Sequence, residues 1–222
     1  LGSALRDLNK MKEAEVSYRK ALKLKPELAE THSNLGNILR NRGKINESIK
    51  SYRKALKLKP RFAEAHHGLG TALKEAGRWE EAIGGYQKAL DIEPESAEAH
   101  NDLGMLQLLL GNFHSGWENY QWRRKVREHR FYPRDYDKPV WDGTNLNGKT
   151  IFIHPEQGLG DFFQFVRYVP MVVARGGKVI LETPVQIARL LKDMNLADTI
   201  VTHDRSLPEF GCHVALMDLP KM

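Results

Sequence analysis

Residues 35–60, LGNILRNRGKINESIKSYRKALKLKP, and residues 69–94, LGTALKEAGRWEEAIGGYQKALDIEP, are two copies of one pattern. Placed on each other, they align with a period of 34 residues. The same spacing separates further prolines, tyrosines and leucines: Pro26, Pro60 and Pro94; Tyr18, Tyr52, Tyr86 and Tyr120; Leu1, Leu35, Leu69 and Leu103. A fixed period with fixed residue types predicts a stack of repeated structural units.

Each unit is predicted to contain two helices. In the second unit, residues 29–41 and 45–58 carry apolar side chains at three- and four-residue spacing, which is typical of amphipathic helices. Gly43 lies between them, in a register that holds only Gly or Asn, the residues that best tolerate the left-handed conformation at a helix end. Gly36 recurs inside the first helix of every unit, which predicts a close approach of another helix.

This pattern resembles the tetratricopeptide repeat, a helix–turn–helix unit of the same period. The resemblance covers residues 1–130, as about three and a half units with a capping helix. It implies an α-solenoid in which the first helix of each unit lines a concave groove. Leu1 falls inside the first unit, so we expect the chain to be part of a longer protein.

The groove positions can be read from the register of the first helices. Asparagine is a weak helix former, yet its amide offers both a donor and an acceptor to an extended peptide backbone. The groove is similar to the asparagine-lined repeats of O-linked N-acetylglucosamine transferases. The residues predicted to bind a peptide or protein partner are Glu30, Asn34, Asn37, Asn41, His67, Thr71, Asn101 and Asp102. The alternative is a set of polar residues exposed on an open solenoid without a ligand.

Composition bounds the class of protein. A chain of 222 residues with 41% hydrophobic content is long enough for two globular domains, and the absence of a long apolar run argues against a membrane partner. The net charge of +6 favours either an acidic partner or a solvated lysine-rich helix face, and the second interpretation is simpler. The lone Cys212 excludes an internal disulfide and favours a reducing, cytoplasmic location.

The fourth unit departs from the pattern. Gln107 replaces a leucine and Arg123 replaces an alanine, as expected where a terminal repeat meets a different neighbour. The basic and aromatic residues around Trp122 could also form a nucleic-acid patch, but a packed capping helix explains them as well, so no nucleic-acid partner is expected. Residues 131–148 contain Pro and Gly turn signals among aromatic residues and are predicted to form a linker pinned against one or both domains.

Residues 149–222 change to alternating strands and helices. Strands are predicted at 150–154, 178–182, 199–202 and 213–216, with helices at 161–175 and 185–193. This alternation is typical of a parallel sheet covered by helices, here a partial α/β Rossmann-like domain. Ligands of such sheets bind at the carboxyl ends of the strands, which draws attention to the loop at residues 155–160, PEQGLG.

Three interpretations of this loop compete. In the first, Asp161 caps the following helix, Gln164 completes a capping box, and nothing binds. In the second, the two glycines belong to a dinucleotide fingerprint with Glu182 as its acidic residue, although Phe163 stands where the third glycine should be.

The third interpretation comes from a resemblance. GWENYQWR at 116–123, WDGTNLNGK at 141–149 and EQGLGDFFQFVRY at 156–168 are similar to bacterial repeat proteins that carry a heptosyltransferase-like glycosyltransferase domain. The resemblance implies the acceptor lobe of a two-lobed GT-B fold, with Asp161 as general base. It also places Gln157, Gly158, Gly160, Gln164 and Arg167 at the acceptor.

The leading functional hypothesis is therefore a repeat module that recruits a protein or peptide, attached to a glycosyltransferase-like acceptor lobe. A nucleotide sugar would be the donor in the complete protein, without metal or other cofactor, and the lobe by itself would be inactive. The alternative is a non-catalytic scaffold that binds peptide or protein partners in the groove of the repeats.

Overall fold

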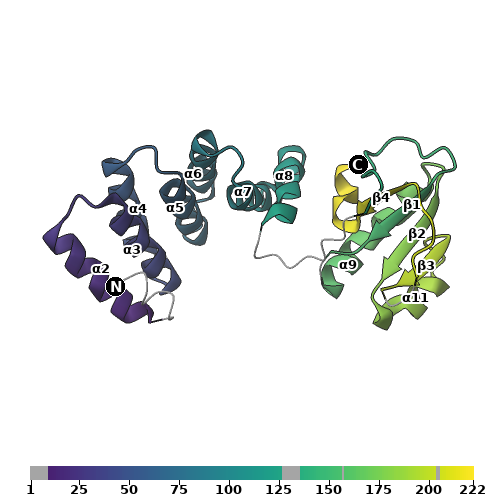
Figure 1. The fold of residues 1–222 in the computed structure, drawn as a ribbon, viewed down its shortest axis with the longest axis horizontal. Coiled ribbons are helices and arrows are strands. Elements are labelled where there is room, and N and C mark those ends of the chain that lie inside the picture. The colour runs from purple at the N-terminus through teal and green to yellow at the C-terminus, as the bar shows by residue number, and fades with distance from the viewer. Residues whose placement is uncertain (1–9, 127–135, 157, 204–205) are drawn as a thin grey trace. The chain divides into compact units, whose positions relative to one another are not determined.

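The computed structural model describes residues 10–126, 136–156, 158–203 and 206–222. The chain divides into two compact units, Leu1–Val126 and Arg127–Met222 (Figure 1). The first is helical, and the second contains a small sheet with helices around it. Each unit is described by itself below.

The first unit is a series of antiparallel helices joined by short turns. Its α-helices are α2 (Met11–Leu24), α3 (Ala29–Asn41), α4 (Ile45–Leu58), α5 (Ala63–Glu75), α6 (Trp79–Ile92), α7 (Ala97–Leu109) and α8 (Phe113–Tyr120). A 3-10 helix, η1 (Gln121–Lys125), follows α8. Helices α3 and α4, α5 and α6, and α7 and α8 form three successive hairpins, which confirms the predicted helix-pair repeat.

The turn inside each hairpin depends on one glycine. Gly43, Gly77 and Gly111 have φ values of 74°, 72° and 81°, in the left-handed region that side chains with a Cβ disfavour. This confirms the predicted reason for Gly at that register. The turns also end the first helix of each hairpin cleanly, because the amide of the next residue bonds back to a helix carbonyl, as Lys44 does to Leu39.

The second recurrent glycine makes room for a tyrosine. A methyl group on Gly36 would lie 2.9 Å from the Tyr52 ring, and one on Gly70 would lie 2.8 Å from the Tyr86 ring. Both rings are fully buried. The Tyr52 ring also lies against Gly68 of the following repeat, so one tyrosine joins two repeats. The expected close approach is confirmed, and the partner is this tyrosine.

A histidine in every repeat fixes the turn between hairpins. His32, His66 and His100 each place Nε2 2.9 Å from the carbonyl oxygen of a proline six residues earlier. The ring N–H donates to a carbonyl that the end of the preceding helix leaves without an intrahelical partner. Three identical contacts at 34-residue spacing therefore set the angle between successive repeats.

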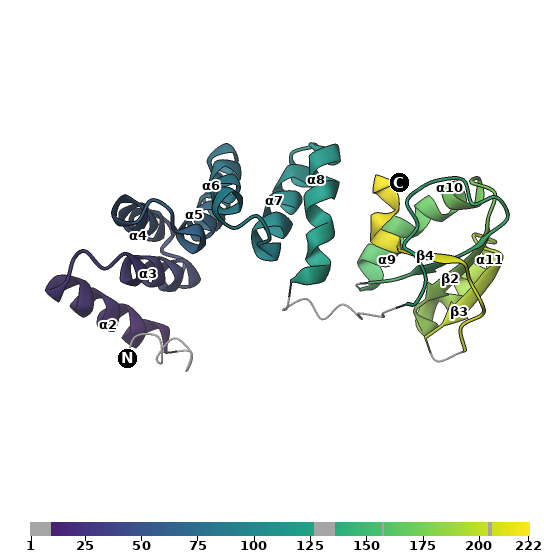
Figure 2. The same ribbon diagram turned by 45° about the horizontal axis from the view of Figure 1, so that its top comes forward.

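The second unit contains a four-stranded parallel sheet in the order β3-β2-β1-β4. Its strands are β1 (Thr150–His154), β2 (Lys178–Thr183), β3 (Thr199–Thr202) and β4 (Cys212–Ala215). Phe152, Ile180 and Val201 lie on one face, against Tyr136, Leu207 and Phe210 from the connecting segments. Figure 2 shows strands β2, β3 and β4 with helices around them. The predicted parallel sheet is confirmed.

The helices of this unit differ from the prediction. A helix kinked at Pro170 was expected at residues 161–175, and the chain divides this stretch into α9 (Leu159–Phe165), the 3-10 helix η2 (Val166–Tyr168) and α10 (Val169–Val173). The break has a simple cause, because Pro170 has no amide hydrogen and is tolerated only in the first turn of a helix, where α10 places it. After β2, η3 (Val185–Ile187) leads into α11 (Ala188–Asp193), and η4 (Leu216–Lys221) follows β4.

The described part of the expected linker, residues 136–148, packs on the second unit. Val140 pairs with His213 of β4, and the amide of Trp141 donates to the His213 carbonyl at 2.8 Å. The buried indole of Trp141 donates to the carbonyl of Thr144. The first part of that linker lies outside the described residues. Among the helices that the structure describes, none is long and apolar enough to span a membrane.

Candidate functional site

The first helices of the three complete hairpins, α3, α5 and α7, carry most of the predicted groove residues. Ion pairs join these helices from one repeat to the next. Arg40 of α3 donates to Glu75 of α5 at 2.8 Å. Lys74 and His67 of α5 both contact Asp102 of α7, at 3.2 and 2.8 Å. The surface of these three helices, called the first-helix surface below, is therefore one connected set of charged and polar groups.

Asp102 lies at the centre of this set. Its side chain is 19% exposed, and burial opposes its ionisation. Hydrogen bonds and positive charge from His67 and Lys74 outweigh that effect, and the pKa of Asp102 is lowered. The carboxylate is therefore held ionised with both partners in place. A ligand reaching this point meets a preorganised charge cluster.

Two buried tyrosines form hydrogen bonds with polar residues of the first-helix surface. The Tyr52 hydroxyl donates to Asn37 Oδ1 at 2.6 Å, and the Tyr86 hydroxyl donates to Thr71 Oγ1 at 3.4 Å. Burial, opposed by the charge of Arg40, raises the pKa of Tyr52 to about 12. The phenol therefore stays a donor, which turns the Asn37 amide so that its Nδ2 is left for other partners.

The remaining predicted groove residues are placed differently from one another. Glu30 is exposed and paired with Lys59 at 2.8 Å, and Asn41 is exposed at the end of α3. Asn34 is half-buried. Asn101 is only 5% exposed, so its amide is not available to a ligand on the open surface. The same register holds the buried Ser33 in α3.

The predicted catalytic loop lies at the carboxyl end of β1. Helix α9 begins at Leu159 with Gly158 as its N-cap, so the interpretation of Asp161 as the capping residue is wrong. Asp161 instead lies half-buried in the first turn of α9, while Gly160, Gln164 and Arg167 are exposed. Gln157 lies outside the described residues. The dinucleotide interpretation also loses its acidic residue, because Glu182 is buried in β2 and contacts His203 at 3.3 Å.

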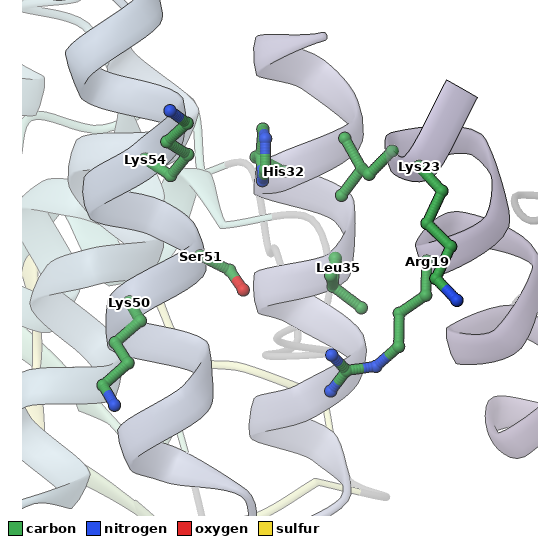
Figure 3. Close-up of a pocket in the computed structure, with 8 residues that line it drawn as sticks. Arg19, Lys23, His32, Leu35, Lys50, Ser51 and Lys54 are labelled. Carbon is green, nitrogen blue, oxygen red and sulfur yellow. The ribbon is translucent and has the colours of Figure 1, made fainter. Parts of the chain in front are cut away.

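A hollow lined by basic residues was not predicted from the sequence. Helices α2, α3 and α4 line an open hollow of about 370 Å³ (Figure 3). Its charged and polar lining comprises Arg19, Lys23, His32, Lys50, Ser51 and Lys54. From the sequence, a solvated helix face was the simpler interpretation of the lysines. The signal that could have revealed the hollow is the 34-residue spacing of His32, because the same ring recurs where helices of adjacent repeats meet.

Within the described ranges, no three His, Cys, Asp or Glu side chains come together to hold a metal ion. His154 and His213 approach each other at 3.3 Å near the end of β1, and Tyr136 packs against both rings. Cys212 is buried in β4, and burial raises the pKa of its thiol, so it is a poor nucleophile.

Comparisons with known proteins concern the repeats. The family described as TPR repeat matches residues 2–40, 36–77 and 70–111. Protein FlbA of Caulobacter vibrioides is 38% identical over 73 residues, which are 30% of this chain and 11% of FlbA. The chain thus spans only a small part of the length of that curated relative.

Two solved structures share the fold of the repeats. The crystal structure of MamA is 28% identical, with a TM-score of 0.53 over 57% of this chain and 74% of MamA. A structure of PilF from Pseudomonas aeruginosa is 25% identical, with a TM-score of 0.53 over 59% of this chain and 60% of PilF. Together with the helix hairpins, the left-handed glycines and the 34-residue period, these matches identify residues 2–111 of the chain as tetratricopeptide repeats.

Proposed function

We propose that the repeats bind an extended peptide segment of a partner protein on the first-helix surface. The observation that carries this proposal is the connected polar set across three repeats, from Arg40 and Glu75 to Asp102 with His67 and Lys74. A set that is fixed before binding lowers the ordering cost of association. The amide of Asn37, turned by Tyr52, then supplies donors to the peptide backbone.

The test begins with peptides selected by phage display against the chain. Replacing Asn34 and Asn41 with alanine removes two amides of the first-helix surface without touching the buried tyrosines. We expect affinity for the selected peptides to fall about tenfold, which corresponds to roughly 1.4 kcal/mol. Lys57→Ala, on the exposed face of α4, is the control and should leave affinity unchanged. Equal affinity of the double variant and the control would contradict the proposal.

A second candidate function concerns the α/β unit. The order β3-β2-β1-β4 is that of the first four strands in a doubly wound sheet, in which ligands bind where the order reverses, beside β1 and β4. Asp161 lies on the helix that follows β1. We accordingly propose that this unit is a Rossmann-like acceptor lobe, with Asp161 as general base. It would act in a cytoplasmic protein that also carries a nucleotide-sugar lobe.

This candidate is tested by glycosyl transfer or hydrolysis with a panel of nucleotide sugars, using the complete protein. Asp161→Asn should abolish turnover, because an amide cannot accept the acceptor proton. Gln164→Ala, one turn further along α9 and exposed, should lower it only modestly. Turnover that survives Asp161→Asn would remove this residue from the mechanism.

A further inference from the structure

The hollow between α2, α3 and α4, called the α2–α4 hollow, is a second surface, separate from the first-helix surface. Leu22 and Leu35 contribute its apolar lining, and His32 stands on the middle helix, as Figure 3 shows. Basic side chains come from both flanking helices, Arg19 and Lys23 from α2 and two lysines from α4. The lining includes no carboxylate. The hollow therefore combines an apolar lining with a positive rim.

The basic side chains of this rim differ in whether an acidic side chain neutralises them. Arg19 is neutralised inside the protein, because it contacts Glu15 at 2.9 Å and Glu47 at 2.5 Å. Lys23, Lys50 and Lys54 form no ion pair with any side chain in the part of the chain that the structure describes. Three unneutralised ammonium groups around one hollow create a local potential that attracts anionic groups.

The repeats provide internal comparisons for this charge. Counting 34 residues onward, the positions of Arg19, Lys23, Lys50 and Lys54 become Arg53, Lys57, Gly84 and Lys88. Another 34 residues onward they become Gln87, Asp91, Glu118 and Trp122. The four basic residues thus fall to three and then give way to two acidic ones. The four basic residues together are therefore particular to the α2–α4 hollow. A lysine face that is merely solvated would recur in every repeat.

The fourth repeat shows what the imidazole of this register accepts. Trp122, which stands at the position of Lys54, stacks on His100 with ring centroids 4.2 Å apart and an interplanar angle of 12°. His100 is held by its bond to the Pro94 carbonyl in the same way that His32 is held by Pro26. The fourth repeat therefore covers this imidazole with an aromatic ring of its own, whereas the α2–α4 hollow leaves His32 in its lining.

We infer that the α2–α4 hollow binds an acidic linear segment of a partner protein that carries an aromatic residue. The aromatic ring stacks on His32 above Leu35, and the flanking carboxylates pair with Lys23, Lys50 and Lys54. Charge complementarity selects the acidic segment, and the stacking of Trp122 on His100 gives the geometry for the ring. His32 and Leu35 lie on α3, but none of the residues invoked here is among the polar residues that carry the proposed peptide surface, so the two can be tested separately.

The test uses the whole chain and a fluorescently labelled synthetic peptide of sequence DEWED, followed by fluorescence anisotropy. Lys50→Glu combined with Lys54→Glu should weaken binding at least about tenfold, a change of roughly 1.4 kcal/mol. The control is Lys57→Glu combined with Lys88→Glu, the same charge change one repeat onward, at the positions that correspond to Lys23 and Lys54, and it should change affinity less than about twofold. Circular dichroism checks that both variants keep their helices.

Two further measurements complete the test. The peptide DEAED should bind about fivefold more weakly, because it lacks the stacking ring. Asn34→Ala with Asn41→Ala should bind DEWED normally, so failure here is distinguishable from failure of the first-helix surface. Equal weakening by both pairs of charge reversals would overturn the inference in favour of a non-specific basic surface. Equal affinity for DEAED, or displacement of DEWED by a single-stranded oligonucleotide at lower concentration, would also overturn it.

Discussion

The hairpin α5–α6 of the third repeat and the hairpin α7–α8 of the fourth share a register but are held together by different chemistry. In α5–α6, Leu73 and Ala89 are buried apolar residues. In the fourth repeat, the same positions hold the buried polar residues Gln107 of α7 and Arg123 of η1. Asn119 of α8 joins α7 by donating to Gln107 Oε1 at 2.9 Å and contacting His100 at 2.6 Å.

The difference shows how one repeat can be modified without losing its geometry. A buried polar group is costly unless it is hydrogen-bonded, so each polar replacement in α7–α8 needs a partner. Arg123 meets part of this need by donating from Nη1 to the Tyr120 carbonyl at 3.2 Å, and its guanidinium lies over the Tyr120 ring at 4.9 Å. In the fourth repeat, hydrogen bonds therefore replace part of the apolar packing that α5–α6 has at the same positions.

The two hairpins should differ most in the stability lost when the glycine inside their first helix, Gly70 in α5 or Gly104 in α7, is replaced. A methyl group on Gly104 would lie 2.5 Å from the backbone nitrogen of Tyr120, whereas one on Gly70 would chiefly meet the Tyr86 ring. Backbone cannot move aside without separating α7 from α8. We expect Gly104→Ala to destabilise the repeats by about 3 kcal/mol and Gly70→Ala by about 1 kcal/mol, once the better helix propensity of alanine is subtracted.

Urea unfolding followed by far-ultraviolet circular dichroism measures both variants. The signal reports mainly on the helices of the repeats. Equal losses in the two variants would show that the ring of Tyr86 is as immobile as the backbone of Tyr120, and the proposed difference between the hairpins would then be wrong.

The next effect depends on pH and concerns the contact that joins the two hairpins. Because the pKa of Asp102 is lower when folded than when unfolded, its contribution to stability is complete above the ordinary carboxyl pKa. It is lost as the pH falls through the folded value. Asp102→Asn should therefore cost about 1–2 kcal/mol near pH 7 and progressively less as the pH falls below the ordinary carboxyl pKa.

The measurement is the free energy of unfolding of both proteins across this pH range. Glu15, whose pKa is also lowered because hydrogen bonds from Lys44 and Arg19 outweigh its burial, keeps part of the acid sensitivity in the variant. Parallel curves for wild type and Asp102→Asn would show that His67 and Lys74 do not stabilise the ionised carboxylate.

Much of the fold was predictable because the same residue types recur at the same positions in several repeats. Gly43 and Gly36 recur at one spacing, and their conformational reasons follow from having no Cβ. The core of the sheet was also predictable, from the β-branched and apolar runs. Helix ends in the α/β unit were less predictable, because Gly158 rather than Asp161 begins α9, and one proline divides a continuous apolar pattern.

The candidate sites were harder to predict, since they depend on which neighbour a side chain meets. Asn34 and Asn101 are both asparagines of a first helix, yet Asn101 shares its register with the buried Ser33, and its own side chain is buried as well. The α2–α4 hollow needed three helices to be placed together before lysines from two of them could be seen around one histidine. Sequence spacing gives positions on one helix and does not give the partners across helices.

The smallest predicted effect is a gain in stability rather than a loss. Gly84 lies inside α6 with no atom within 4 Å of where a methyl group would stand, in contrast to Gly70 and Gly104. Alanine there reduces the conformational freedom of the unfolded chain and meets no obstacle in the folded one, so Gly84→Ala should stabilise the repeats by about 0.5–1 kcal/mol. The same urea titration measures it. A loss of stability would show that this segment of α6 is more closely covered than its open surroundings indicate, and it would weaken the assignment of the Gly104 effect to steric contact.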